Sequence, residues 1–195
     1  MDEYEILEAI IIMMILKKGR PADFMQRLAK EQRVYKLLDE LGVEYWYVDH
    51  KEAETMEICA EIDKVLRCKI CKNLFLCNRQ QTQFYLLMID HSKVFKTKDI
   101  TGQLGCSRLS FASAEYMEKF LDITPGSVSV LGLMNDRDKV VRLAIDNSVL
   151  NEEYVGCHPC INTSSLKIKV NDLLEKILPA LGYEPTIVDL PTYSE

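Results

Sequence analysis

The sequence predicts an α+β fold in which helices surround a curved, mixed and largely antiparallel β-sheet. Residues 164–170 alternate between apolar and polar side chains, which is the period of a half-buried strand. Residues 28–41 instead carry apolar side chains at helical spacing. Segments of both kinds interleave along the chain, and no internal repeat or low-complexity linker separates them. This pattern indicates a single mixed domain.

Turn and capping residues mark the expected elements in order. Pro21 can open the first helix and Gly42 can end it, while Thr55 and Asn171 can cap later helices. Helices are expected over residues 21–41, 55–66, 97–104, 113–123 and 171–181. Strands are expected over residues 44–48, 74–77, 84–89, 109–112, 128–134, 140–145, 164–170 and 186–190.

Length and composition favour one globular domain in a reducing compartment. A chain of 195 residues can bury one sizeable core, and 48% apolar with 28% charged residues is ordinary for such a domain. Three of the first five residues are acidic, whereas a secretory leader begins with basic residues. Seven cysteines is an odd number, so we expect free thiols and a cytoplasmic location.

An apolar run over residues 6–16 precedes the rest of the chain. Only Glu8 interrupts it, and it is shorter than the about 20 residues that a membrane span needs. We therefore expect no membrane association, but a helix that packs on the domain or in an oligomer interface and ends at residues 17–19. The predicted organisation is an N-terminal helical extension over residues 1–20 and one domain over residues 21–195.

Charge is distributed unevenly along the chain. The net charge is −6, which argues against a general nucleic-acid binder. Residues 64–98, however, contain eight lysine and arginine side chains and a single acid, Asp90, so this window carries a net charge of +7. Two interpretations stay open, namely an ordinary solvated surface and a local face that binds phosphate groups.

Two C-x-x-C pairs form the most distinctive local pattern. The first ends at Cys71, directly before Lys72, and the second, Cys157 and Cys160, flanks His158. Such pairs in a zinc site are typically about 15–20 residues apart, whereas 86 positions separate Cys71 from Cys157. Neither pair lies at a helix start within a βαβ pattern, as a thioredoxin-like redox pair would. Metal binding and redox chemistry stay open, but thiols that fill small apolar spaces are favoured.

Candidate functional residues lie beside these cysteines. Lys72 opens an apolar strand, so its ammonium group lies at the rim of the sheet and suits a phosphate, and Asn73 adds an amide donor and acceptor. His158 precedes a proline that restricts its backbone, and Gly126 can bring bare backbone amides close to a ligand. Each of these residues also has an ordinary structural interpretation. No Ser-His-Asp or Cys-His arrangement and no phosphate-binding glycine loop stands out.

Five short motifs follow one another along the chain. They are Lys-Asn-Leu-Phe-Leu at 72–76, Arg-Leu-Ser-Phe-Ala at 108–112, Thr-Pro-Gly-Ser-Val at 124–128, Gly-Leu-Met-Asn-Asp at 132–136, and His158-Pro159 followed by Asn162-Thr163. In this order they resemble the motifs of the freestanding prolyl-tRNA editing proteins of the YbaK/ProX superfamily, over about residues 21–191. Motifs in a fixed order are more specific than any one alone, and the similarity looks greatest to the branch that deacylates alanyl-tRNA(Pro).

The resemblance implies roles for individual residues. Lys72 matches the family's functionally central lysine, and Asn73 and His158 match residues that line the pocket for the terminal adenosine and the amino acid. Gly126 lies in the loop that resembles the family's G-x-x-x-P element, and these four are the expected catalytic residues. Arg108 matches a basic position implicated in reading the acceptor stem. The other expected substrate- or tRNA-binding residues are Ser127, Ser129, Asn162 and Thr163.

The implied activity is hydrolysis of the ester in mischarged tRNA(Pro), chiefly Ala-tRNA(Pro). Such an ester is already activated, so a positioned water, a stabilised oxyanion and the substrate's own ribose hydroxyl can replace a protein nucleophile. A small pocket would admit alanine and exclude proline. No cofactor or metal is expected. The implied partners are the acceptor end of mischarged tRNA(Pro), prolyl-tRNA synthetase and a second copy of the chain.

The chain departs from the family pattern at three positions. Val130 stands where many members carry proline, and Cys157 and Cys160 stand where an aromatic or polar residue is expected. These departures keep two alternatives open. One is a non-catalytic module that binds tRNA acceptor ends or a synthetase, and the other is a deacylase for cysteine or serine.

Overall fold

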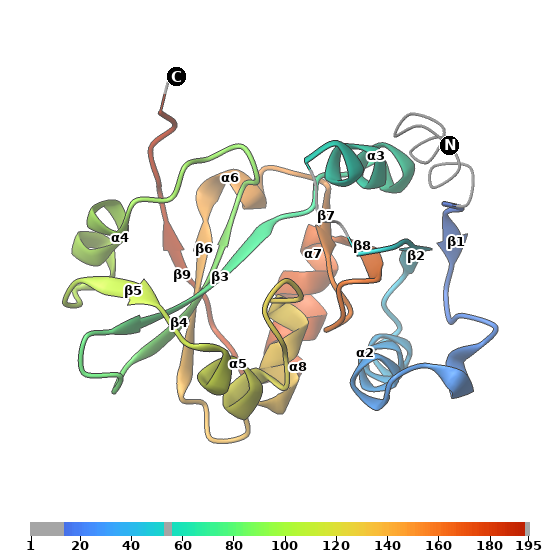
Figure 1. The fold of residues 1–195 in the computed structure, drawn as a ribbon, viewed down its shortest axis with the longest axis horizontal. Helices are drawn as coiled ribbons and strands as arrows, with labels where there is room; N and C mark the ends of the chain where they lie inside the picture. The colour runs from blue at the N-terminus through green and yellow to red at the C-terminus, as the bar shows by residue number, and fades with distance from the viewer. Residues whose placement is uncertain (1–13, 53–55, 194–195) are drawn as a thin grey trace.

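Two β-sheets lie side by side in the computed structural model, which describes residues 14–52 and 56–193 (Figure 1). The smaller sheet is antiparallel throughout. The strand order is β1 (Lys17–Lys18), β2 (Tyr45–Asp49), β8 (Ser164–Lys169) and β7 (Tyr154–Cys157) in the smaller sheet, and β5 (Leu109–Phe111), β3 (Lys72–Asn78), β4 (Phe84–Ile89), β6 (Val141–Asp146) and β9 (Thr186–Val188) in the larger. In the larger sheet, β4 with β6 and β6 with β9 are parallel pairs, whereas β3 is antiparallel to both β4 and β5. The predicted α+β class is confirmed, with two sheets where the sequence predicted one.

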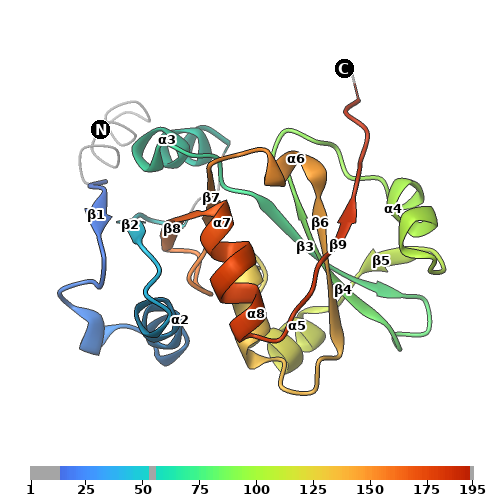
Figure 2. The ribbon, with the colours of Figure 1, turned by 180° about the vertical axis from the view of Figure 1, so that it is seen from behind.

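Helices cover both sheets, and a C-terminal helical segment lies between them (Figure 2). That segment is continuous from residue 170 to residue 180 and contains one π-helical turn in its middle. The helices are η1 (Phe24–Gln26), α2 (Ala29–Glu40), α3 (Met56–Leu66), α4 (Thr97–Leu104), α5 (Ala114–Leu121), η2 (Val130–Asn135), α6 (Asn147–Leu150), α7 (Val170–Asp172), η3 (Leu173–Ile177) and α8 (Leu178–Ala180).

Strand β4 shows why the larger sheet is apolar on both faces. Its six residues are all buried. Leu86 and Met88 pack in the main core towards the C-terminal helical segment, whereas Leu87 and Ile89 pack in a second cluster with Ile100 of α4. Burying a leucine, isoleucine or methionine side chain stabilises a fold by about 1.5–3 kcal/mol. A strand covered on both faces therefore reads as a continuous apolar run rather than an alternating one.

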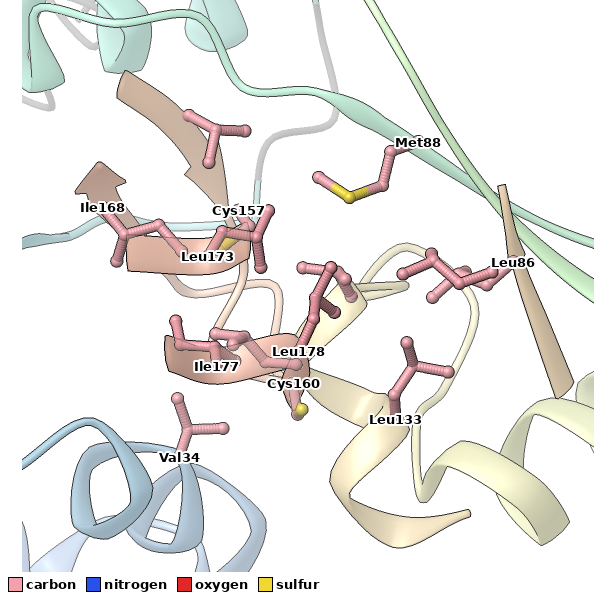
Figure 3. Packing of buried hydrophobic residues seen from close by; sticks show 14 of the residues in the cluster. Val34, Leu86, Met88, Leu133, Cys157, Cys160, Ile168, Leu173, Ile177 and Leu178 are labelled. Carbon is pink, nitrogen blue, oxygen red and sulfur yellow. The ribbon is translucent and has the colours of Figure 1, made fainter. Parts of the chain in front are cut away.

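The main core joins the two sheets (Figure 3). Leu173, Ile177 and Leu178 of the C-terminal helical segment pack in one cluster with Val34 of α2 and Ile168 of β8. Each of these side chains is fully buried. Because residues from both sheets and from α2 share this cluster, the relative position of the sheets is fixed by apolar packing.

The strand predicted over residues 128–134 is wrong, because these residues lead into and form the 3₁₀ helix η2. Ser129 caps it by accepting a hydrogen bond from the amide of Leu131 at 3.2 Å. At Gly132 an added Cβ would lie 2.3 Å from Cδ1 of Ile123 and 3.2 Å from Cβ of Leu121. The first four residues of this helix, 130–133, are all buried and carry no polar side chain, so they show no helical period.

The N-terminal part of the chain also differs from its prediction. The helix expected over residues 6–16 lies mostly outside the described residues, but residues 14–16 are not helical and Lys17–Lys18 pairs with Trp46 and Tyr47 of β2. Of the helix expected over residues 21–41, residues 24–26 form η1 and only Ala29–Glu40 is α-helical. Strand β7 and helix α6 were not expected. Among the described residues, no helix combines the length and apolarity needed to cross a membrane.

Candidate active site

The two C-x-x-C segments meet where the two sheets approach each other. Ile70, just before β3, forms an isolated parallel bridge with Gly156 of β7. The amide of Cys71 donates to the carbonyl of Gly156, and the amide of Gly156 donates to the carbonyl of Lys69, each at 3.0 Å. A Cβ on Gly156 would lie 2.9 Å from the Cα of Ile70. Only glycine therefore allows this approach, which brings the strand that begins at Lys72 beside the strand that leads to His158.

A cavity of about 310 Å³ lies at this junction. Helix α3, the start of β3, the turn after β4 and the loops around Gly126 and His158 contribute its wall. The wall combines apolar side chains with charged and hydrogen-bonding groups, as in sites that orient one small polar ligand. Its residues are Glu52, Cys59, Ile62, Asp63, Ile70, Cys71, Lys72, His91, Gly126, His158 and Asn162.

Lys72 is the first residue of β3, and its side chain is exposed at the cavity. Its Nζ donates a hydrogen bond to the carbonyl oxygen of Lys93 at 3.1 Å. No carboxylate of the described residues lies within ion-pair distance of this ammonium group. The charge of Lys72 is therefore not neutralised within the described structure and is available to an anionic ligand.

Asn73 lies next to this wall without being part of it. Its Nδ2 donates to the carbonyl of Cys71 at 3.1 Å, whereas its Oδ1 is buried and has no hydrogen-bond partner. Leaving a buried acceptor unsatisfied costs about 1–3 kcal/mol. A ligand bound in the adjacent cavity could donate a hydrogen bond to this oxygen, which would explain why it has no partner in the protein.

The loop at Gly126 contributes backbone rather than hydroxyl groups to the cavity. Gly126 has a φ of +86°, and a Cβ there would lie 3.7 Å from Nδ2 of Asn162 on the same wall. The hydroxyl of Ser127 donates to the carbonyl of Thr124 at 2.8 Å, and that of Ser129 caps η2. Both serines are buried outside the cavity wall, so these hydroxyls hold the loop in shape.

His158 presents one ring nitrogen to backbone and has the other free for the cavity. Its Nδ1 lies 3.0 Å from the carbonyl oxygen of Ser164. A carbonyl only accepts, so Nδ1 carries the hydrogen and Nε2 holds a lone pair. Burial lowers the pKa of His158, which keeps the ring neutral near pH 7. The geometry therefore provides a hydrogen-bond acceptor or proton acceptor on the cavity wall.

Two other predicted residues lie outside the cavity wall. Arg108 borders a separate surface depression with Phe95, Lys96, Lys98 and Phe111, which is formed by the segment before α4, by α4 and by β5. Thr163 contributes its carbonyl to the amide of His50 at 3.0 Å. The structure thus brings together four of the nine predicted site residues in one wall, with Asn73, Ser127 and Ser129 beside it or supporting it. The four are Lys72, Gly126, His158 and Asn162.

Sequence reasoning does not single out three ionisable residues of the wall, Glu52, Asp63 and His91. Asp63 accepts a hydrogen bond from the amide of Ile70 at 2.9 Å, and burial raises the pKa of its carboxyl group. Nδ1 of His91 is buried without a hydrogen-bond partner. The spacing of Cys59 and Asp63, one helical turn apart on α3, is the signal that could have placed Asp63 on this face.

The thiols near the cavity are protonated and unpaired. All seven cysteines are free, and burial raises the pKa of Cys71 to about 12 and that of Cys157 still further. A protonated thiol is neither a good nucleophile nor a good metal ligand. Within the described residues, no three His, Cys, Asp or Glu side chains are grouped to hold a metal ion. The packing interpretation of these cysteines is therefore favoured over redox chemistry.

Comparison with known proteins gives the class of this domain. Residues 50–176 match the aminoacyl-tRNA editing domain, and this range contains the complete cavity wall. The chain therefore belongs to the aminoacyl-tRNA editing domain family, and the predicted enzyme class, an aminoacyl-tRNA deacylase, is confirmed.

Individual relatives narrow this class to prolyl-tRNA editing proteins. The chain is 34% identical over 152 residues to the prolyl-tRNA editing protein ProX of Acetoanaerobium sticklandii, a match that covers 78% of this chain and 92% of that protein. It is 26% identical over 190 residues to prolyl-tRNA synthetase associated domain-containing protein 1 of Danio rerio, covering 96% and 98%. A crystal structure described as a candidate trans-editing enzyme for prolyl-tRNA synthetase has the same fold, with a TM-score of 0.63 and 16% identity over 86% of this chain and 99% of that one. The predicted family is confirmed.

Proposed function

We propose that this protein hydrolyses the ester of mischarged tRNA(Pro) in trans, and that Ala-tRNA(Pro) is its main substrate. The observation that carries the proposal is one cavity that gathers Lys72, Gly126, His158 and Asn162 in a chain of the editing family. The name of the Acetoanaerobium sticklandii relative supports prolyl tRNA as the RNA.

Lys72 holds the acceptor end of the RNA in this proposal. Its unneutralised ammonium group stands at the cavity, where it can pair with a phosphate of the terminal nucleotides. The hydrogen bond to the carbonyl of Lys93 sets the direction of the side chain without cancelling its charge. A charged side chain oriented in this way places the ester next to the wall before hydrolysis begins.

Hydrolysis then needs a water, a proton acceptor and donors for the developing oxyanion. The bare Nε2 of His158 accepts a hydrogen bond from the attacking water or from the ribose hydroxyl that assists it. Backbone at Gly126 and the amide of Asn162 lie on the same wall and stabilise the carbonyl oxygen as it gains charge. Water adds to the ester carbon, the ribose oxygen leaves with a proton, and free amino acid and tRNA result.

The apolar part of the wall supports selection of a small amino acid. Cys59, Ile62, Ile70 and Cys71 line the cavity and are well suited to a methyl side chain. Each extra methylene changes discrimination by only about 1–3 kcal/mol. Exclusion of proline therefore rests on steric limits of a rigid wall, and Ile70 is held rigidly by its bridge to Gly156.

The domain binds its RNA through a second basic surface and has protein partners in this proposal. Arg108, Lys96 and Lys98 border one surface depression and contact the acceptor stem. The two lysines belong to the basic window over residues 64–98, which thereby binds phosphate groups of the RNA. Prolyl-tRNA synthetase and a second copy of the chain are the proposed protein partners, and the reaction takes place in the cytoplasm. Residues 1–20 are an extension of a single editing domain over residues 21–195.

The decisive experiment is a panel of aminoacylated tRNA(Pro) species offered to the purified protein. We expect release of alanine well above the uncatalysed rate and little release of proline. The same panel tests the two alternatives. Preferred release of cysteine or serine would redirect the substrate assignment, and tight tRNA binding without any deacylation would identify a binding module.

A further inference from the structure

We propose that His50 and Ser165, which lie behind the cavity wall, are positioning residues that hold His158 in a single neutral tautomer with its lone pair on Nε2. The structural part of this inference concerns hydrogen positions and stands by itself. Its catalytic consequence rests on the function proposed above, in which Nε2 of His158 accepts a hydrogen bond from the attacking water.

A continuous chain of polar contacts links the two histidines. Nδ1 of His158 lies 3.0 Å from the carbonyl oxygen of Ser164 and 3.4 Å from Oγ of Ser165. The same Oγ lies 2.9 Å from Nε2 of His50, and Nδ1 of His50 lies 2.7 Å from the carbonyl oxygen of Lys51. The two imidazole rings are 6.3 Å apart between centroids and tilted by 55° to each other, and Oγ of Ser165 bridges Nε2 of His50 and Nδ1 of His158.

The chemistry of these partners assigns each hydrogen. The carbonyl of Lys51 only accepts, so Nδ1 of His50 donates and Nε2 of His50 keeps its lone pair. Ser165 then donates its hydroxyl hydrogen to that lone pair and is left with acceptor capacity only. Nδ1–H of His158 is therefore shared between Oγ of Ser165 and the Ser164 carbonyl. The opposite tautomer of His158 would leave Nδ1 as a lone pair facing the carbonyl oxygen, which is repulsive.

Burial makes this arrangement costly to break. Ser164 and Ser165 are 0% exposed, and His50 is 9% exposed. The hydroxyl of Ser164 is itself occupied, because it donates to the carbonyl of Val48 at 3.2 Å. Polar groups buried in this way are stable only when hydrogen-bonded. Burial also lowers the pKa of both histidines, so both imidazole rings are neutral near pH 7.

The strand register explains how His50, Ser165 and His158 come to lie next to one another. Antiparallel pairing of β2 with β8 sets Asp49 opposite Ser164 and Val48 opposite Ser165. His50 is the next residue after β2, and the amide of His50 donates to the carbonyl of Thr163. The end of β2 and the start of β8 are therefore neighbours, and they hold His50 beside the segment that connects β8 to His158.

Tautomers can be measured directly in the intact protein. The chain has three histidines, so an ¹⁵N–¹H correlation spectrum of histidine-labelled protein is simple, and a His91→Gln variant assigns the third ring. We expect a protonated Nδ1 and an unprotonated Nε2 for His158. In Ser165→Ala and His50→Leu we expect His158 to show a mixture of tautomers or a raised pKa. A wild-type His158 that is protonated on Nε2 would overturn the proposal without reference to enzymatic activity.

The matched variant His50→Gln separates positioning from proton transfer. Glutamine keeps an acceptor oxygen for the hydroxyl of Ser165 but does not titrate in this range. We expect His50→Gln to keep the His158 tautomer and most of kcat, whereas His50→Leu and Ser165→Ala lose about tenfold in kcat with little change in KM. Equal losses in His50→Gln and His50→Leu, or an unchanged His158 spectrum in Ser165→Ala and His50→Leu, would contradict a positioning role. Absence of deacylation in the wild type would reject only the proposed function.

Discussion

At the scale of single residues, Lys72 tests the proposed chemistry most directly. Its ammonium group is exposed at the cavity, and its only hydrogen-bond partner among the described residues is the carbonyl of Lys93. We expect Lys72→Ala to lower kcat/KM by at least about 100-fold, because a charge that positions a phosphate is lost, while the melting temperature hardly changes. Lys69→Ala is the control, since Lys69 is exposed in the same basic window but does not line the cavity. Equal activity in both variants would remove Lys72 from the mechanism.

The two linked histidines predict how stability depends on pH. Burial lowers the pKa of His50 and His158 below the value of about 6.5 that they have when unfolded. Below that pH the unfolded chain binds protons that the folded protein does not, so the free energy of unfolding falls as pH falls. Chemical denaturation between pH 7.5 and about 5 measures this slope. We expect a shallower slope in His50→Gln, and an identical slope would show that His50 does not contribute.

Single residues also mark the limit of prediction from sequence. Lys72, Gly126, His158 and Asn162 could be chosen from motifs, and all four line one cavity. Ser127 lies in the motif of Gly126 and Ser129 directly follows that motif, yet their hydroxyls bond to their own loop and helix. A motif gives residue types but not side-chain direction. His50 was not predicted because it becomes relevant only through Ser165, which lies 115 positions away in the chain.

At the scale of elements, strands buried on one or both faces were predicted well. Strands β3, β4, β6 and β8 and helices α3, α4 and α5 lie close to their expected ranges. Prediction failed at η2, where tight packing at Gly132 replaced extended backbone. It also failed at β7, whose place in the sheet is set by pairing with β8 and by the bridge to Ile70. These determinants are tertiary and leave no local period.

A buried ion pair supports the turn that holds Lys72. Lys93 and Asp146 are joined at 2.7 Å, with side chains 9% and 0% exposed, and Lys93 also donates to the carbonyl of Leu190 at 2.6 Å. Asp146→Ala leaves the Lys93 charge buried and unpaired, so we expect a loss of about 3–5 kcal/mol in unfolding free energy. The double variant Lys93→Met with Asp146→Leu should be less destabilised than Asp146→Ala alone. Additive losses in urea denaturation would contradict this coupling.

At the scale of the whole molecule, the cavity lies where two separate sheets, joined by a shared apolar core, come into backbone contact. The larger sheet contributes Lys72 through β3, and the smaller sheet leads through β7 to His158. Two backbone hydrogen bonds around Ile70 and Gly156 connect them, and the shared apolar core fixes their mutual position. The paired cysteines flank this junction as packing residues, and their neighbours carry the polar groups.

Substitution of Gly156 tests whether this junction holds the site. In Gly156→Ala the new Cβ would meet the Cα of Ile70 at 2.9 Å and the carbonyl oxygen of Lys69 at 3.0 Å. Backbone atoms cannot move aside cheaply, so we expect a loss of about 1–3 kcal/mol in unfolding free energy and a larger relative loss of deacylation, because Lys72 and His158 separate. Gly102→Ala is the matched control, since it lies in α4 with nothing within 4 Å of its Cβ, and it should stabilise by about 0.5–1 kcal/mol. A Gly156→Ala protein with native stability and activity would show that the cavity does not depend on close contact between the sheets.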